Sequence, residues 1–173
     1  MALTATLYHL KLELSDVDRG VYTPLDLRLA RLIAYCLAYT EGIAFSKEGI
    51  ASTDDPPIAV RDPTGQLLEW IDVGAPSAER LHRATRMARR VSLYTSAALA
   101  QLQREAASRT IPRVEEIEVW RLEPAFLDAV DPRVDRNSKL ELVRTDGLLY
   151  FTAGGEVIEG TITRGSLVAG DPA

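Results

Sequence analysis

The chain has 173 residues, of which 46% are hydrophobic and 26% are charged, and its formal net charge is −5. This length suits one domain with its own core, and the acidic balance excludes a surface that is basic over its whole extent. The single cysteine excludes an internal disulfide and a cysteine-based zinc site, and no apolar run approaches the roughly 18–20 residues of a membrane span. Because the first residues also lack a signal-peptide pattern, we expect one cytoplasmic domain spanning residues 1–173, without membrane contact. We expect a monomer, although no sequence feature fixes the oligomeric state.

The first part of the chain predicts a hairpin followed by a helix. Residues 4–14 and residues 25–29 alternate between apolar and polar side chains, which is typical of two paired strands. Residues 31–41 have apolar side chains at helical spacing, and Gly42 is a suitable helix stop. No turn or capping residue separates Ala30 from Arg31, so we predict a gap or an abrupt change in the chain at that junction.

The remainder predicts alternating strands and helices and then antiparallel hairpins. The sequence Asp62–Gly65 is typical of a type I turn, and Asp146–Gly147 and Gly154–Gly155 are typical of hairpin turns. The expected strands are residues 58–61, 67–73, 91–95, 117–120, 140–142, 148–152 and 157–163. The expected helices are residues 77–89, with Ser77 as the N-cap, 96–108 and 125–130. We therefore predict an α/β fold with a central mixed sheet flanked by helices.

Two aspartates, Asp55 and Asp72, are the best candidates for chemistry. If Asp62 and Gly65 close the turn, the hairpin register places Asp55 directly opposite Asp72, with Cβ atoms about 5 Å apart. Bare carboxylates at that distance repel one another, and a divalent ion such as Mg²⁺ or Mn²⁺ between them removes the repulsion. Glu41 offers a third carboxylate. The alternative is an ordinary loop in which these acids are separately solvated.

A basic helix follows the hairpin. No acid occurs between residues 80 and 90, and Arg80, Arg83 and Arg90 recur at spacings that place them on one helix face. Such a face beside paired acids indicates a phosphate-binding surface, and the alternative is a solvated helix face.

Other reactive or aromatic side chains have ordinary structural interpretations. Cys36 lies among apolar neighbours, so we expect a buried thiol. The two histidines, His9 and His82, are too few and too far apart for a zinc site. The aromatic side chains of Trp70, Tyr94 and Trp120 are expected at the edge of the core.

Several short segments occur in an order that a known family shares. They are Leu3–Thr6, Asp16–Arg19, Phe45–Lys47, Asp54–Pro56, Asp62–Gly65 and Trp70–Gly74. In this order they resemble the YaeQ family, over the first half of the chain and more loosely to about residue 160. The resemblance implies a variant of the PD-(D/E)xK nuclease fold, and it places Asp55, Asp72 and Glu41 at the positions of that fold's acids.

The chain departs from the nuclease pattern at two places. Asp72-Val73-Gly74 has no lysine where the acid-x-lysine motif requires one. The position on the next helix that could replace it holds Arg83, and a guanidinium stabilises charge but cannot act as a base. Lys47 is an alternative. A polar stretch that the family carries is missing between Ala30 and Arg31, at the junction already identified.

Two functions follow from this resemblance and from the paired acids. The first is a metal-dependent phosphodiesterase acting on nucleic acid, with Mg²⁺ or Mn²⁺ on Asp55, Asp72 and Glu41. Arg83 or Lys47 would then stabilise the developing charge. The second is a non-catalytic module of the same fold that binds nucleic acid or a transcription-related protein partner. The missing lysine favours the second function, and the intact acids favour the first.

Overall fold

One mixed sheet organises the part of the chain that the computed structural model describes, which is residues 3–5, 25–47, 52–134 and 140–170. Within these residues nine strands pair in the order β1-β7-β8-β9-β6-β5-β4-β3-β2. The pairs β4–β5 and β5–β6 are parallel, and the other pairs are antiparallel. The predicted α/β fold with a mixed sheet is therefore confirmed.

The helices and strands alternate in the middle of the chain and give way to strands at its end. The strands are β1 (Leu3–Ala5), β2 (Ile43–Phe45), β3 (Ile58–Arg61), β4 (Leu67–Val73), β5 (Arg90–Thr95), β6 (Glu118–Leu122), β7 (Leu140–Thr145), β8 (Leu148–Ala153) and β9 (Glu156–Gly165). The α-helices are α2 (Leu25–Leu37), α3 (Ala78–Met87), α4 (Leu99–Ala107) and α5 (Pro124–Val130). Short 3₁₀ turns occur at Val114–Glu116 and Asp131–Arg133. From β3 onward, every predicted strand and helix is present, with ends shifted by a few residues.

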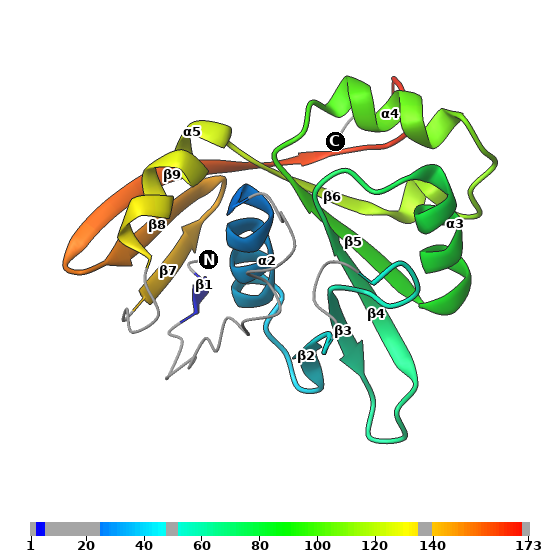
Figure 1. Cartoon of the computed structure of the whole chain (residues 1–173), viewed down its shortest axis with the longest axis horizontal. Helices are drawn as coiled ribbons and strands as arrows, with labels where there is room; N and C mark the ends of the chain where they lie inside the picture. Colours follow the sequence, from blue (N-terminus) through cyan, green and yellow to red (C-terminus); the bar gives the residue numbers. More distant parts are fainter. Residues whose placement is uncertain (1–2, 6–24, 48–51, 135–139, 171–173) are drawn as a thin grey trace.

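The sheet curls around α2, and its two faces carry different helices (Figure 1). We call the face that packs against α2 and α5 the inner face, because both helices share one hydrophobic core with it. The opposite, outer face of β4, β5 and β6 packs against α3 and α4 in a second core. No helix in the described segments is both long and apolar enough to cross a membrane.

The predicted strand at residues 25–29 and the predicted break after it are wrong. Residues Leu25–Leu37 form one continuous helix, so the Ala30–Arg31 junction lies inside α2. Leu29, Ile33 and Cys36 are buried at spacings of three and four, which is the period of a helix facing a core. The alternation of leucines over five residues was too short to distinguish a strand from the first turn of this helix. Most of the predicted strand at residues 4–14 lies outside the described residues.

The hairpin formed by β3 and β4 is present, but its predicted register is wrong by two residues. The prediction implied that Ile58 faces Glu69, whereas Ile58 pairs with Ile71. One residue of the shift arises at the turn, where Asp62 N–H bonds to the carbonyl of Gln66. The second arises at a β-bulge beside Val60 and Arg61. Asp55 and Asp72 are therefore not cross-strand neighbours.

The glycine that ends the Trp70–Gly74 segment has a specific structural role. Gly74 follows β4 with a φ of +81°, a conformation that residues with a Cβ atom rarely adopt. A Cβ atom at this position would lie 2.3 Å from a methyl group of Leu27 on α2. The Gly74 N–H also donates to the Tyr94 carbonyl on β5, 2.9 Å away. The positive φ therefore favours glycine here, and any larger residue would also displace the Leu27 side chain.

Candidate functional site

Asp72 is buried on the outer face of the sheet, under α3. Its side chain alternates with Ile71 and Val73, which face the inner core, and it is 2% exposed. Oδ2 accepts hydrogen bonds from Trp70 Nε1 at 3.1 Å and from Arg80 Nε at 2.6 Å. Oδ1 accepts from the N–H of Val73 at 3.1 Å. The carboxylate is thus paired with a cation and hydrogen-bonded through both oxygens.

Arg80 also fixes the segment that precedes β3. Its Nη1 donates to the carbonyls of Ser52 at 2.8 Å and Thr53 at 3.2 Å, and its Nη2 donates to the carbonyl of Asp55 at 3.0 Å. One guanidinium therefore has four oxygen partners from two separate parts of the chain. The N-cap at Ser77 explains this position, because its Oγ accepts from the Arg80 N–H at 3.2 Å and sets the first turn of α3. The N-cap was correctly predicted from the sequence.

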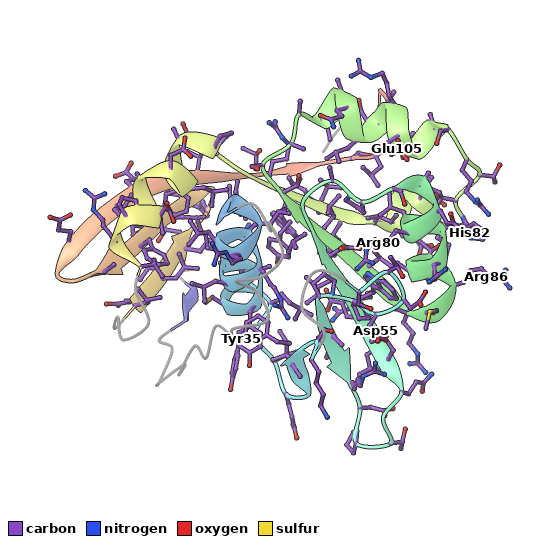
Figure 2. All side chains as sticks on the ribbon, in the orientation of Figure 1. Tyr35, Asp55, Arg80, His82, Arg86 and Glu105 are labelled. Carbon is purple, nitrogen blue, oxygen red and sulfur yellow. The ribbon has the colours of Figure 1, made fainter. Side chains whose placement is uncertain are left out.

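The three acids predicted as metal ligands do not form one site. Asp55, labelled with Arg80 in Figure 2, is exposed and contacts Arg80 through its backbone carbonyl. The Asp72 carboxylate is buried against the same guanidinium. Glu41 is exposed and follows α2 by four residues, because that helix ends at Leu37 and not at Glu41 as predicted. Among the described residues no three His, Cys, Asp or Glu side chains are grouped to hold an ion. The arrangement does not fit a resident Mg²⁺ or Mn²⁺, since Arg80 already fills the cationic position at Asp72.

The predicted phosphate-binding arginines are divided between different elements and partners. Arg83 on α3 is paired with the Asp54 carboxylate and donates to the Thr53 carbonyl at 3.3 Å. Arg90 does not continue the helix face as predicted, because α3 ends at Met87 and Arg90 begins β5. It pairs with Glu69 at 2.8 Å and is 68% exposed. Lys47 is exposed beyond the end of β2, which is an edge strand of the sheet, whereas α3 packs over β4 and β5.

Other basic side chains at the end of α3 are exposed. Arg86 and Arg89 are exposed, and within the described segments neither has an ion-pair partner. Figure 2 shows His82 and Arg86 projecting outward from the helix. Arg113 holds the end of this helix, because its guanidinium donates to the carbonyls of Thr85, Ala88 and Arg89. The exposed basic face thus lies on an anchored helix end.

A second polar cluster, which the sequence analysis did not identify, lies on the inner face of the sheet. Glu69 is 8% exposed and accepts from Ser92 Oγ at 2.6 Å and from Arg90 at 2.8 Å. Burial raises the pKa of the Tyr94 phenol, the neighbouring Glu69 carboxylate raises it further, and Arg144 lowers it. The alternation of polar and apolar residues around Ser92 indicated a polar side chain on the inner face of β5. The contact with Glu69 could not be predicted from it without knowing that β4 and β5 are neighbours in the sheet.

Comparison with known proteins identifies the family. The family model described as YaeQ protein matches residues 1–162. The chain belongs to the YaeQ family.

Relatives in this family resemble the chain over nearly its whole length. The uncharacterised YaeQ protein of Escherichia coli K12 is 26% identical over 176 residues, covering 94% of this chain and 97% of the relative. The corresponding protein of Salmonella typhi is 24% identical with the same coverage.

Solved structures of the family have the same fold. The YaeQ protein from Pseudomonas syringae superposes with a TM-score of 0.70 at 24% identity, covering 87% of this chain and 90% of that one. The YaeQ protein from Xanthomonas axonopodis pv. citri gives 0.71 at 24% identity, covering 88% and 93%. At these identities the likeness supports the fold and not a particular reaction.

Proposed function

We propose that this chain is a non-catalytic nucleic-acid-binding module built on a variant of the PD-(D/E)xK nuclease fold. The observation that carries the proposal is the pairing of Arg80 with Asp72 at 2.6 Å. In the nuclease pattern this carboxylate would hold a metal ion. Here a guanidinium, which stays protonated at any physiological pH, holds both the carboxylate and three carbonyls of the segment before β3.

The position of Asp72 in the fold also favours a binding function over catalysis. The carboxylate is 2% exposed, so a phosphodiester could reach it only after α3 or the residue 52–55 segment moved. The acid-x-lysine position is occupied by Gly74, whose backbone supports the packing of α2. No described side chain beside Asp72 can therefore take a proton from a water molecule in the way that a lysine amine could.

The exposed end of α3 is the surface best suited to nucleic acid. Arg86 and Arg89 are exposed there without acidic partners in the described segments, and the chain has no acid between residues 80 and 90. Because the net charge is −5, phosphate attraction must be local, and this patch supplies it. The binding contacts are predicted to be salt-sensitive and independent of base sequence.

The test is binding of a fluorescein-labelled 20-mer duplex and of its single strand, followed by anisotropy at several salt concentrations. We expect association that weakens as salt rises, and each of Arg86→Gln and Arg89→Gln should reduce the salt slope by about one. Arg133→Gln is the control, because it removes one positive charge from the turn after α5, which Figure 1 shows on the other side of the molecule from α3, and there Arg133 is paired with Glu156. Equal loss in all three variants, or no binding at low salt, would refute the α3 surface.

The competing enzymatic function is tested in the same preparation. Titration calorimetry with Mg²⁺ and Mn²⁺, together with a cleavage assay on the same oligonucleotides, should give neither binding in the micromolar to millimolar range nor product. Metal binding together with cleavage, both abolished by Asp72→Asn, would contradict the proposal. That result would show that Arg80 moves away from the Asp72 carboxylate when the protein is in solution, and that the chain is a phosphodiesterase.

A further inference from the structure

The inner face of the sheet carries an aromatic and basic cluster at the end that lies away from α5. Trp120 on β6 has two arginines near its ring, with the Arg144 guanidinium 4.4 Å and the Arg164 guanidinium 6.0 Å from the ring centroid. Arg164 is the direct cross-strand partner of Trp120, and Arg144 comes from β7. Strand alternation places all three on the inner face, since Leu122, Ile162 and Leu142 lie two residues away in the inner core.

The charges of this cluster are not fully compensated within the described structure. Arg144 donates through Nε to the carbonyl of Asp146 at 3.0 Å, and neither Arg144 nor Arg164 has a carboxylate partner in the described segments. Arg164 is exposed and Trp120 is partly exposed. Two cations beside one indole ring repel each other, so an anion that binds beside both of them is stabilised.

The starts of β5 and β6 lie between the end of α3 and this cluster. Ser92 pairs with Glu118 at the start of β6, two residues before Trp120. Arg90, two residues before Ser92, is 68% exposed at the start of β5 and directly follows Arg89. Two acids lie on this route, Glu69 paired with Arg90 and Glu118 opposite Ser92, so the end of α3 and the Trp120 cluster are separate basic areas.

We propose that Trp120, Arg144 and Arg164 form a stacking site for an unpaired base and its phosphate, so that the chain prefers single-stranded nucleic acid. The exposed part of the indole offers an aromatic surface to a base, and the exposed Arg164 guanidinium offers N–H groups to phosphate. A duplex keeps its bases stacked inside and cannot use an indole on the face of a sheet. This inference rests on the proposed binding function, and it names the class of nucleic acid.

The experiment compares a dT20 single strand with a dT20·dA20 duplex in anisotropy and in tryptophan emission. Trp70 is fully buried, so quenching of emission by dT20 that disappears in Trp120→Phe reports contact at Trp120. We expect dT20 to bind at least about tenfold more tightly than the duplex, and Trp120→Ala to remove that preference. Trp120→Phe should retain most of it, because the phenyl ring can still stack.

A second variant keeps the test valid if Trp120→Ala does not fold. Arg164→Gln changes an exposed side chain, and we expect it to weaken dT20 binding several-fold more than duplex binding. Tyr39→Ala is the matched control for loss of an exposed aromatic ring, because Tyr39 is 65% exposed at the end of α2. Equal affinity for strand and duplex, with loss only in Arg86→Gln and Arg89→Gln, refutes the stacking site and leaves the proposed function standing. Absence of binding to either ligand refutes both.

Discussion

Replacing Arg80 with methionine tests whether a buried guanidinium holds the candidate site together. The Arg80 side chain is 15% exposed and that of Asp72 is 3% exposed, so water screens their attraction weakly. Removing one partner of a buried ion pair leaves an uncompensated charge and costs about 3–5 kcal/mol. The hydrogen bonds from Trp70 and Val73 remain, but they cannot neutralise the carboxylate. We therefore expect Arg80→Met to lower the free energy of unfolding by about 3–5 kcal/mol.

The same helix supplies a matched control for this prediction. Arg83 lies three residues later and also pairs with an aspartate, but the side chains of Arg83 and Asp54 are 38% and 76% exposed. Exposed pairs contribute up to about 1 kcal/mol, so Arg83→Met should cost less than that. Urea unfolding followed by circular dichroism at pH 7 measures both variants. Equal losses in the two variants would show that burial does not determine the strength of the Arg80 pair.

A third variant separates the buried charge from the lost packing. In Arg80→Met combined with Asp72→Asn the side chain under α3 is neutral, and the asparagine oxygen can still accept from Trp70. We expect the double variant to be more stable than Arg80→Met alone. If the two losses add, the uncompensated charge is not the cause.

Two further predictions concern pKa values. The Thr64 hydroxyl, 2.6 Å away, and backbone N–H groups hold the pKa of Asp62 below its usual range. The stability that these hydrogen bonds contribute is therefore present at neutral pH and is lost as the pH falls through the folded-state pKa. Thr64→Val should raise that pKa in an NMR titration, and an unchanged value would contradict the assignment. Burial raises the pKa of the Cys36 thiol to about 12 from an ordinary value of 9.0, so the stability that the neutral thiol contributes should be complete below pH 9.0 and decline toward pH 12. A thiol reagent at pH 8 should label the native protein far more slowly than the urea-unfolded chain. Equal labelling rates would show that Cys36 is accessible in the native protein.

The sequence was informative wherever local chemistry decides the structure. The hairpin turn at Asp62–Gly65, the N-cap at Ser77 and the two hairpins after residue 140 depend on turn and capping residues, and all are present. The helix at Leu25–Leu37 was misread because its first five residues alternate like a strand, and only the packing of α2 inside the curled sheet selects the helical period. The buried thiol predicted for Cys36 is confirmed.

The candidate site was less predictable because it depends on register and on contacts between distant segments. A one-residue extension of the turn and a β-bulge beside Val60 together displaced Asp55 from Asp72. Arg80 meets Ser52, Thr53 and Asp55 across 25 to 28 residues of sequence, and no spacing rule on α3 indicates such a contact. Of the three aromatic side chains predicted at the edge of the core, Trp120 is partly buried there, whereas Trp70 and Tyr94 are buried inside the two cores.

The two faces of β4 constrain any metal-dependent reaction in this chain. Asp72 faces α3 on the outer face, whereas α2, which Glu41 follows, packs on the inner face. Glu41, which follows α2, and the Asp72 carboxylate therefore lie on opposite sides of β4. The two carboxylates could bind the same ion only if both reached it past the end of that strand. Glu69 does face inward, but Ser92 and Arg90 already bind it. Catalysis would require Arg80 to leave and a second ligand to come from outside this set, whereas binding through Arg86 and Arg89 requires no rearrangement.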